Sequence, residues 1–270
     1  MNYLKYIITF FYVLAFCFCV FSQQPQFDIT STVKENKLPL YHPKTLLFGN
    51  GKTVMTPSGW GGYGNTIFVG GGMALRQVYA DKPDGAAVFG IGLGNPFRNI
   101  GFEISTKMND LSEQDGFSYF FKIHKYIGKG TSLAFGGDHL FFTNDSDGIS
   151  SYFLSLSHAF QNMPSKIPGL SRMNINIGIG SGKFANKSPR DEAEGKGKTG
   201  TYIFGSLAYQ LFRNHSFIVE WSGINFNIAV SSKPIRRLPV FLKISLVDLT
   251  SYSGDGVRVV ICGVVAYSIS

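Results

Sequence analysis

The sequence has little charge, little cysteine and no long apolar run beyond its start. Only 16% of its 270 residues are charged, against about 25% in a typical soluble domain. Two of the three cysteines are Cys17 and Cys19, so Cys262 stands alone downstream and forms no internal disulfide. The longest later apolar run, residues 259–267, has nine residues, whereas a membrane helix needs ~20. These absences exclude a disulfide scaffold and membrane helices after residue 22.

Familiar catalytic and ligand-binding patterns are missing too. The five histidines show no metal-ligand spacing. Residues 195–199 resemble the end of a phosphate-binding loop, but Glu192 stands where its first glycine belongs. His158 and His215 each have a serine beside them, but neighbours on a strand face opposite sides of a sheet, so neither pair meets. We therefore expect no metal, no cofactor and no enzymatic activity.

The first 22 residues predict a secretory signal peptide. Lys5 precedes an apolar run over residues 7–21, and small or compact residues precede a cut between Ser22 and Gln23. That run is too short for a comfortable membrane helix. Residues 23–58 are polar, interrupted by four prolines and without a sustained period. We interpret residues 23–58 as an irregular periplasmic leader or plug.

Glycine and aromatic residues are abundant, with 32 Gly, 25 Phe and 13 Tyr. So much glycine disfavours helices. Apolar and polar residues alternate along many segments, as at Ile175, Ile177 and Ile179, and a period of two indicates strands with one apolar face. The chain is therefore predicted to be all-β. The predicted strands are residues 64–80, 84–94, 100–108, 117–127, 131–141, 150–160, 172–184, 200–212, 215–221, 224–231, 238–249 and 257–268.

The strand count depends on one short turn. If Ser222-Gly223 is a two-residue hairpin turn, the chain has twelve strands. If Gly223 only kinks one long strand, the count is eleven, and ten is the lower alternative. Bacterial single-chain barrels have an even number of strands, so twelve is favoured.

The polar face of these strands identifies the medium around the apolar face. In a soluble sandwich the second face meets water and carries many charges, but here it is mainly Gly, Ser, Ala and Asn with isolated ionic groups. Such a face suits the interior of a modest barrel, which leaves the apolar face to lipid. The ring must then close, because each unpaired edge group in hydrocarbon costs several kcal/mol. Residues 59–270 are therefore predicted to form a closed antiparallel transmembrane β-barrel. Its predicted lumen-lining residues are Arg76, Glu103, Lys107, Lys122, His124, Asp138, Glu220, Lys243 and Arg258.

Charges and aromatic residues sort by position along the strands. Connections after odd-numbered strands hold eleven of the 17 acidic residues, whereas connections after even-numbered strands hold basic residues and no acid. The longest connection, residues 185–199, belongs to the odd set, and outer loops exceed periplasmic turns in length. The acidic side is therefore predicted to face outward from the outer membrane of a Gram-negative bacterium. Aromatic residues predicted at the membrane interfaces are Tyr79, Tyr126, Phe141, Phe142, Tyr152, Phe160, Phe184, Phe212, Trp221, Tyr252 and Tyr267.

Six short stretches resemble, in order, a group of uncharacterised outer-membrane β-barrel-like proteins of Gram-negative bacteria. They are Gly92-Leu93-Gly94-Asn95-Pro96, Gly101-Phe102-Glu103-Ile104-Ser105, Lys122-Ile123-His124-Lys125, Gly178-Ile179-Gly180-Ser181-Gly182, Glu220-Trp221-Ser222-Gly223-Ile224-Asn225 and Val247-Asp248-Leu249-Thr250. The resemblance covers about residues 56 to 270 and implies a membrane barrel without assigned catalytic residues. Such barrels often end in an aromatic residue, whereas this chain ends Tyr267-Ser268-Ile269-Ser270.

Two functions follow from a charged lumen. A twelve-stranded barrel is wide enough for a narrow channel, and six basic or titratable lumen residues against three acidic ones predict a mild anion preference. Alternatively the same charges pair and close the lumen, which gives a structural or partner-binding barrel. A receptor that uses the acidic loops is a third interpretation. The expected partners are outer-membrane lipids, lipopolysaccharide and the barrel-assembly machinery, with no nucleic acid, and the oligomeric state stays open.

Overall fold

The computed structural model describes residues 52–110, 115–142, 148–165, 170–234 and 240–269. The chain divides into two units, residues 1–39 and 40–270, and all described residues belong to the second. The predicted signal peptide, its cut after Ser22 and residues 23–51 of the predicted leader lie outside the described residues.

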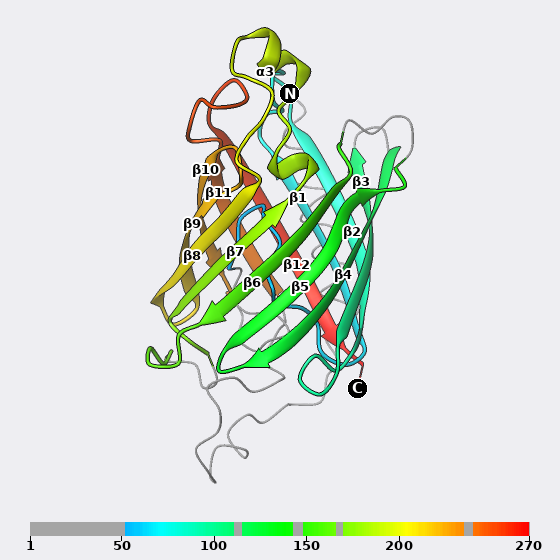
Figure 1. Cartoon of the computed structure of the whole chain (residues 1–270), viewed down its shortest axis with the longest axis vertical. Helices are drawn as coiled ribbons and strands as arrows, with labels where there is room; N and C mark the ends of the chain where they lie inside the picture. Colours follow the sequence, from blue (N-terminus) through cyan, green and yellow to red (C-terminus); the bar gives the residue numbers. More distant parts are fainter. Residues whose placement is uncertain (1–51, 111–114, 143–147, 166–169, 235–239, 270) are drawn as a thin grey trace. The chain divides into compact units, whose positions relative to one another are not determined.

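Twelve antiparallel strands form one closed ring (Figure 1). Each strand pairs with its sequence neighbours, and the first pairs with the last from Thr66 opposite Ser268 to Ala74 opposite Val260. The prediction of a closed barrel with twelve strands is confirmed, and the alternatives of ten and eleven are wrong. The strands are β1 (Thr66–Ala74), β2 (Asp84–Gly94), β3 (Gly101–Asp110), β4 (Asp115–Gly128), β5 (Thr131–Leu140), β6 (Ser151–Ala159), β7 (Met173–Gly180), β8 (Ile203–Phe212), β9 (His215–Trp221), β10 (Phe226–Ser232), β11 (Val240–Val247) and β12 (Arg258–Ser268).

Several predicted strand ends are wrong, each for a local reason. The first strand stops at Ala74 rather than at residue 80, because the chain folds into a hairpin in which the Gln77 amide donates to the Lys82 carbonyl and Tyr79 has a φ of 61°. The turn between β9 and β10 has four residues rather than two. Ser222 closes that turn, since its hydroxyl accepts from the Asn225 amide at 3.0 Å.

The connection from β7 to β8 holds the only helices named among the described residues. Strand β7 ends at Gly180 rather than at residue 184, and a short 3-10 helix, η1 (Gly182–Phe184), follows it. Helix α3 (Pro189–Ala193) lies further along the same connection, which Figure 1 shows beyond the ends of the strands. Within the described residues, no helix has the length and apolar character needed to cross a membrane.

Burial alternates along the strands as the sequence predicts. Along β7 the exposed fractions of Ile177 and Ile179 are 55% and 56%, whereas Asn176 before them and Gly178 between them are buried. On β6, Leu154 and Leu156 are exposed while Ser155 and Ser157 are buried. The apolar side chains therefore face outward and the small polar ones face the lumen. An outward apolar belt on a closed ring is the surface that lipid chains solvate.

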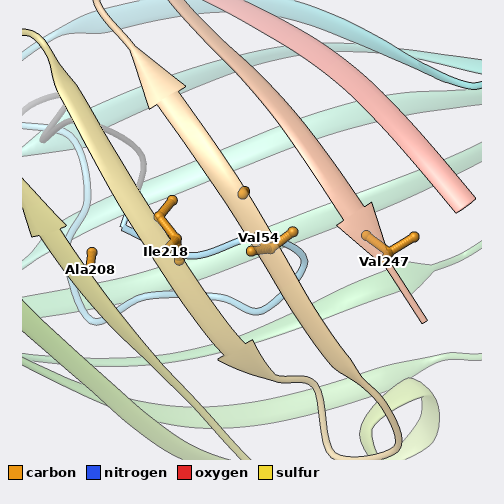
Figure 2. Close-up of a cluster of buried hydrophobic side chains, with 5 residues drawn as sticks. Val54, Ala208, Ile218 and Val247 are labelled. Atoms are coloured by element: carbon orange, nitrogen blue, oxygen red, sulfur yellow. The ribbon is translucent and has the colours of Figure 1, made fainter. Parts of the chain in front are cut away.

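Small apolar clusters lie inside the ring. Val54, Ala208, Ile218, Ala229 and Val247 form one of them, and Figure 2 shows Val54 among side chains from β8 to β11. This places an apolar side chain from before the first strand against the inner wall.

A second cluster corrects one aromatic prediction. Phe184 is buried with Phe153 and Phe204 inside the ring rather than at a membrane interface, because η1 turns it inward. Phe141, Tyr152 and Phe212 are exposed near strand ends, as the interface prediction requires.

Candidate functional site: the barrel lumen

Residues 52–63, called the plug from here on, cross the lumen. Side chains from strands β3 to β9 and from β11 hydrogen-bond to the plug. A segment that touches strands from most of the way round a closed ring lies inside that ring, where Figure 1 shows it in blue. Residues 52–58, the described part of the leader or plug predicted over residues 23–58, therefore lie inside the barrel.

Glu220 on β9 holds one part of the plug. Its carboxylate accepts from the amides of Val54 at 2.6 Å, Met55 at 2.7 Å and Thr56 at 3.3 Å, and from the Thr56 hydroxyl at 2.8 Å. Asn227 on β10 also donates to Glu220 at 3.2 Å. Glu220 is 0% exposed, and a buried carboxylate is tolerated only when such donors replace its water.

Uncharged side chains hold the middle of the plug. The Pro57 carbonyl accepts from Ser155 on β6 and from Asn176 on β7, both at 3.0 Å. Gly59 donates its amide to Ser157 at 2.8 Å, and its carbonyl accepts from Ser132 on β5 at 2.7 Å. The Pro57 carbonyl and both the amide and the carbonyl of Gly59 thus have partners in the wall.

An ion pair holds the stretch of the plug nearest β1. Lys122 on β4 donates to the Trp60 carbonyl at 2.8 Å and lies 2.6 Å from Glu103 on β3. Glu103 in turn accepts the Gly62 amide at 2.5 Å, and the Gly62 carbonyl lies 2.8 Å from Nε2 of His124. Two charged side chains and an imidazole therefore contact the main chain of two plug residues, Trp60 and Gly62.

The fit around the plug is tight at two of its glycines. A Cβ atom at Gly59 would meet the Ser132 carbonyl oxygen, and one at Gly61 would meet the His124 ring. A Cβ atom at Gly62 would have no neighbour nearer than 3.5 Å, which is ordinary contact. Gly59 and Gly61 therefore leave no room for a larger residue unless the wall moves.

A three-charge cluster joins the wall to η1. Asp138 on β5 hydrogen-bonds to Lys107 on β3 and to Lys183 of η1, the latter at 2.5 Å. The two ammonium groups lie over the rings of Phe120 and Phe184, at 5.5 and 5.1 Å from the ring centroids. This cluster ties η1 to the wall at β3 and β5.

Residues 181–202, called the lid from here on, span the far end of the barrel. In a ring of twelve strands, β7 stands six places from β1. Asp191 of α3 nevertheless accepts from Tyr79 in the β1–β2 connection at 2.5 Å and from Ser253 and the Gly254 amide in the β11–β12 connection, both at 2.7 Å. The lid therefore reaches across the mouth rather than turning back beside its own strands.

Asp191 is the anchor of the lid and is 1% exposed. Burial by itself would raise the pKa of this carboxyl, but hydrogen bonds from Tyr79, Ser253, Ser188 and the Gly254 amide outweigh it and hold the pKa well below its usual range. Lys196 lies 3.7 Å from the same carboxylate and donates to the Gly254 carbonyl at 2.6 Å. The ionised form of Asp191 is thus the form that keeps the lid in place.

The predicted lumen residues fall into paired groups rather than a free ionic lining. Glu103 pairs with Lys122, and Lys107 pairs with Asp138. Glu220 and Lys243 bind the plug main chain, Lys243 donating to the Val54 carbonyl at 2.6 Å. Two of the predicted residues pair at the lid end, in the bonds Arg76–Asp255 and Arg258–Asp248, both at 2.6 Å.

Arg76 lies in the β1–β2 connection, beyond the strand that was predicted to carry it. Sequence reasoning missed the roles of Lys183 and Asp191, which depend on a loop that crosses the barrel and has no sequence signature.

Sequence reasoning also missed a hydroxyl–imidazole pair. Thr131 on β5 and Nδ1 of His158 on β6 are 2.8 Å apart, because the two residues are register partners on adjacent strands. Both belong to the outward-facing set of their strands. Among the described residues no third polar side chain hydrogen-bonds to this imidazole, so nothing there orients it as a catalytic base.

The geometry defines a closed β-barrel with a filled lumen. Neither a protein-family model nor a curated protein matches the chain. Solved structures with a similar fold include the KdgM porin, with 10% identity over 76% of this chain and 99% of that one and a TM-score of 0.46. A second is the COG4313 outer membrane channel from Pseudomonas putida F1, with 7% identity over 81% of this chain and 98% of that one and a TM-score of 0.42. A third is the outer membrane phospholipase A from Escherichia coli, with 10% identity over 85% of this chain and 97% of that one and a TM-score of 0.40. At these values the likeness concerns the fold alone, and function has to be argued from this chain's own residues.

Proposed function

We propose that this protein is an outer-membrane channel for small solutes whose lumen is closed, in the arrangement described, by its own plug. The outward apolar belt supports a bilayer location, since the exposed leucine and isoleucine side chains of β6 and β7 would be poorly solvated by water. The lid, the longest connection, supports an orientation with that end outside the cell. Outer-membrane lipids and lipopolysaccharide are then the surrounding partners.

The observation that carries the channel is the polar character of the plug contacts. The wall holds the plug by hydrogen bonds to Ser, Asn, Glu and Lys side chains, and water can replace each of these when the plug leaves. Val54 and Trp60 are the plug's two buried large apolar residues among those described, so its apolar hold is small. A plug of this kind is removable, unlike an apolar core.

The charges support only a slight ion preference. With the partners that the structure adds, six cationic side chains stand against five carboxylates. One net positive charge, contributed where Lys107 and Lys183 share Asp138, favours anions mildly. We propose no catalytic role, since the Thr131–His158 pair lacks an orienting group among the described residues.

Conductance in planar bilayers tests the channel. We expect small, rare openings from the intact protein and sustained openings from a variant that lacks residues 52–61, measured alone and with Asp191→Asn to free the lid. Reversal potentials in a KCl gradient should show a weak anion preference. Heat-modifiable migration on a gel checks that each variant is a folded barrel. Folded variants that never conduct at any voltage would contradict the channel.

The alternative function is a closed structural or partner-binding barrel. One observation favours it: the lumen is obstructed twice, by the plug and by the lid with its buried Phe184. Two independent obstructions exceed what a simple pore needs. The same bilayer experiment separates the two functions, because a closed barrel stays silent after the plug is removed.

A further inference from the structure

We propose that the lumen wall is a binding site for the main chain of a polypeptide segment, and that a short peptide is the class of ligand it accepts once the plug has left. The plug then occupies this site as a built-in ligand. The binding site is inferred from the contacts between plug and wall, and only the passage of such a peptide through the barrel rests on the proposed function.

The wall's hydrogen bonds go chiefly to the plug's peptide groups. Amides of the plug donate to Glu220, Ser157 and Glu103. Carbonyls of the plug accept from Ser206, Lys243, Ser155, Asn176, Ser132 and Lys122. Thr56 adds its hydroxyl. Because these contacts address peptide groups rather than side chains, they recognise a polypeptide main chain, bent at residues 54–56 where three successive amides reach Glu220.

The pattern of donors and acceptors fits a peptide better than the competing polar solutes. Glu220 accepts three consecutive amides, Val54 to Thr56, a spacing that a polypeptide supplies and an oligosaccharide does not. A polyanion would meet the Glu220 and Glu103 carboxylates, both buried or half-buried in the wall, and burying like charges together is costly.

Side-chain positions along the plug define the preference of the site. Val54 lies in an apolar recess formed by Ala208, Ile218, Ala229 and Val247. Trp60 packs with Ala159, Phe97 and Tyr126. Gly59 and Gly61 on either side of Trp60 lack space for a Cβ atom, whereas Gly62 has it. The preferred peptide therefore has an apolar residue, then five and seven places later a glycine, with an aromatic residue between the two glycines.

Peptide binding to the emptied barrel tests the inference. The protein would be the folded variant without residues 52–61, and the probe a fluorescent synthetic peptide of residues 52–63. We expect saturable binding that weakens at least tenfold when the peptide carries Gly61→Ala and changes less than twofold with Gly62→Ala. A neutral maltooligosaccharide and inorganic polyphosphate are the competitors, and neither should displace the peptide. Equal binding of the two alanine peptides, or displacement by either competitor, would overturn the inference.

Two further outcomes separate this inference from the channel. Peptide binding by a barrel that never conducts would support the binding site and contradict the channel. Conductance that no peptide blocks, in a barrel that binds no peptide, would support the channel and overturn the binding site. If the deletion variant does not fold, the full-length Gly61→Ala protein serves, because its own plug would clash with the His124 ring while the wall is unchanged. The added peptide of residues 52–63 should then displace this plug, and absence of exchange there would overturn the inference.

Discussion

Replacing Glu220 with glutamine removes the charge that holds the plug to β9. The carboxylate accepts four hydrogen bonds from residues 54–56, three from consecutive amides and one from the Thr56 hydroxyl. A glutamine at this place has one acceptor oxygen, and its NH₂ group would point at plug donors. The barrel itself should persist, since the substitution preserves volume and β9 keeps its ladder with β8 and β10.

The expected size of the effect follows from these bonds. Hydrogen bonds to a charged group contribute about 1.5–3 kcal/mol each, but the four share one carboxylate and the freed amides regain water, so the sum is far smaller than four separate bonds. We therefore expect Glu220→Gln to lower the free energy that holds the plug in its seated position by roughly 2–4 kcal/mol. At about 1.4 kcal/mol per factor of ten, the equilibrium between seated and displaced plug shifts roughly thirtyfold to several hundredfold.

Two measurements report this shift. The first is the labelling rate of Ser58→Cys by a thiol reagent, in a background where Cys262 is replaced by serine, which follows plug displacement directly. The second is open probability in planar bilayers. The matched control is Glu192→Gln, an exposed carboxylate of α3 paired with Lys198 at 2.8 Å, which should change neither. If Glu220→Gln labels no faster than the control while remaining a heat-modifiable barrel, the plug is not held by this carboxylate and our reasoning fails.

Three other predictions concern different contacts. Gly61→Ala should raise the labelling rate of the Ser58→Cys thiol at least tenfold, because the new Cβ atom would clash with the His124 ring, whereas Gly62→Ala should leave the rate unchanged. Equal rates in the two variants would show that His124 moves aside and that the plug stays seated. The pKa of Asp191 is lowered, so the stability that its ionised form adds to the lid is complete above the ordinary value of 3.8, declines below it, and is lost only as the pH falls through the lowered pKa. Spin labels at residues 82 and 187 should therefore keep their distance at about pH 4 in the unchanged protein but spread apart at pH 7 in Asp191→Asn, and an unchanged distance in that variant would refute the anchoring role of Asp191. Ile177→Lys, on the outward face, should cost about 2–4 kcal/mol of unfolding free energy in vesicles, with Ile177→Leu as control, and a cost near zero would mean that this face does not meet lipid.

The ring could be predicted because its signal is local and repeated. Alternation such as Ile175, Ile177 and Ile179 needs no knowledge of the rest of the chain, and it predicted twelve strands, the number that the closed ring has. The errors occur where backbone geometry overrides composition. Tyr79 adopts a positive φ in a hairpin that the apolar pattern does not reveal, and Phe184 follows a strand-like run into a 3-10 helix.

The contents of the lumen could not be predicted in the same way. The sequence identifies Glu220, Glu103 and Lys122 as isolated ionic residues on a small-residue face, but their partners are peptide groups of the plug, and peptide groups leave no trace in composition. Asp191 and Tyr79 meet only because the lid spans the ring, and Thr131 meets His158 only through strand register. Such meetings follow from topology rather than from sequence neighbours.

The place of the plug in the chain has a consequence for biogenesis. The plug ends at residue 63 and β1 begins at Thr66, so the segment that fills the ring is tethered directly to the strand that seals it against β12. Laying this segment on the concave side of an open, curved sheet before Val69 meets Val265 lets each strand bind it as the sheet grows, without a separate step of entry into a closed ring. The pairing of β1 with β12 is thus expected to be the last one made during insertion, after the plug has bound to the inner wall.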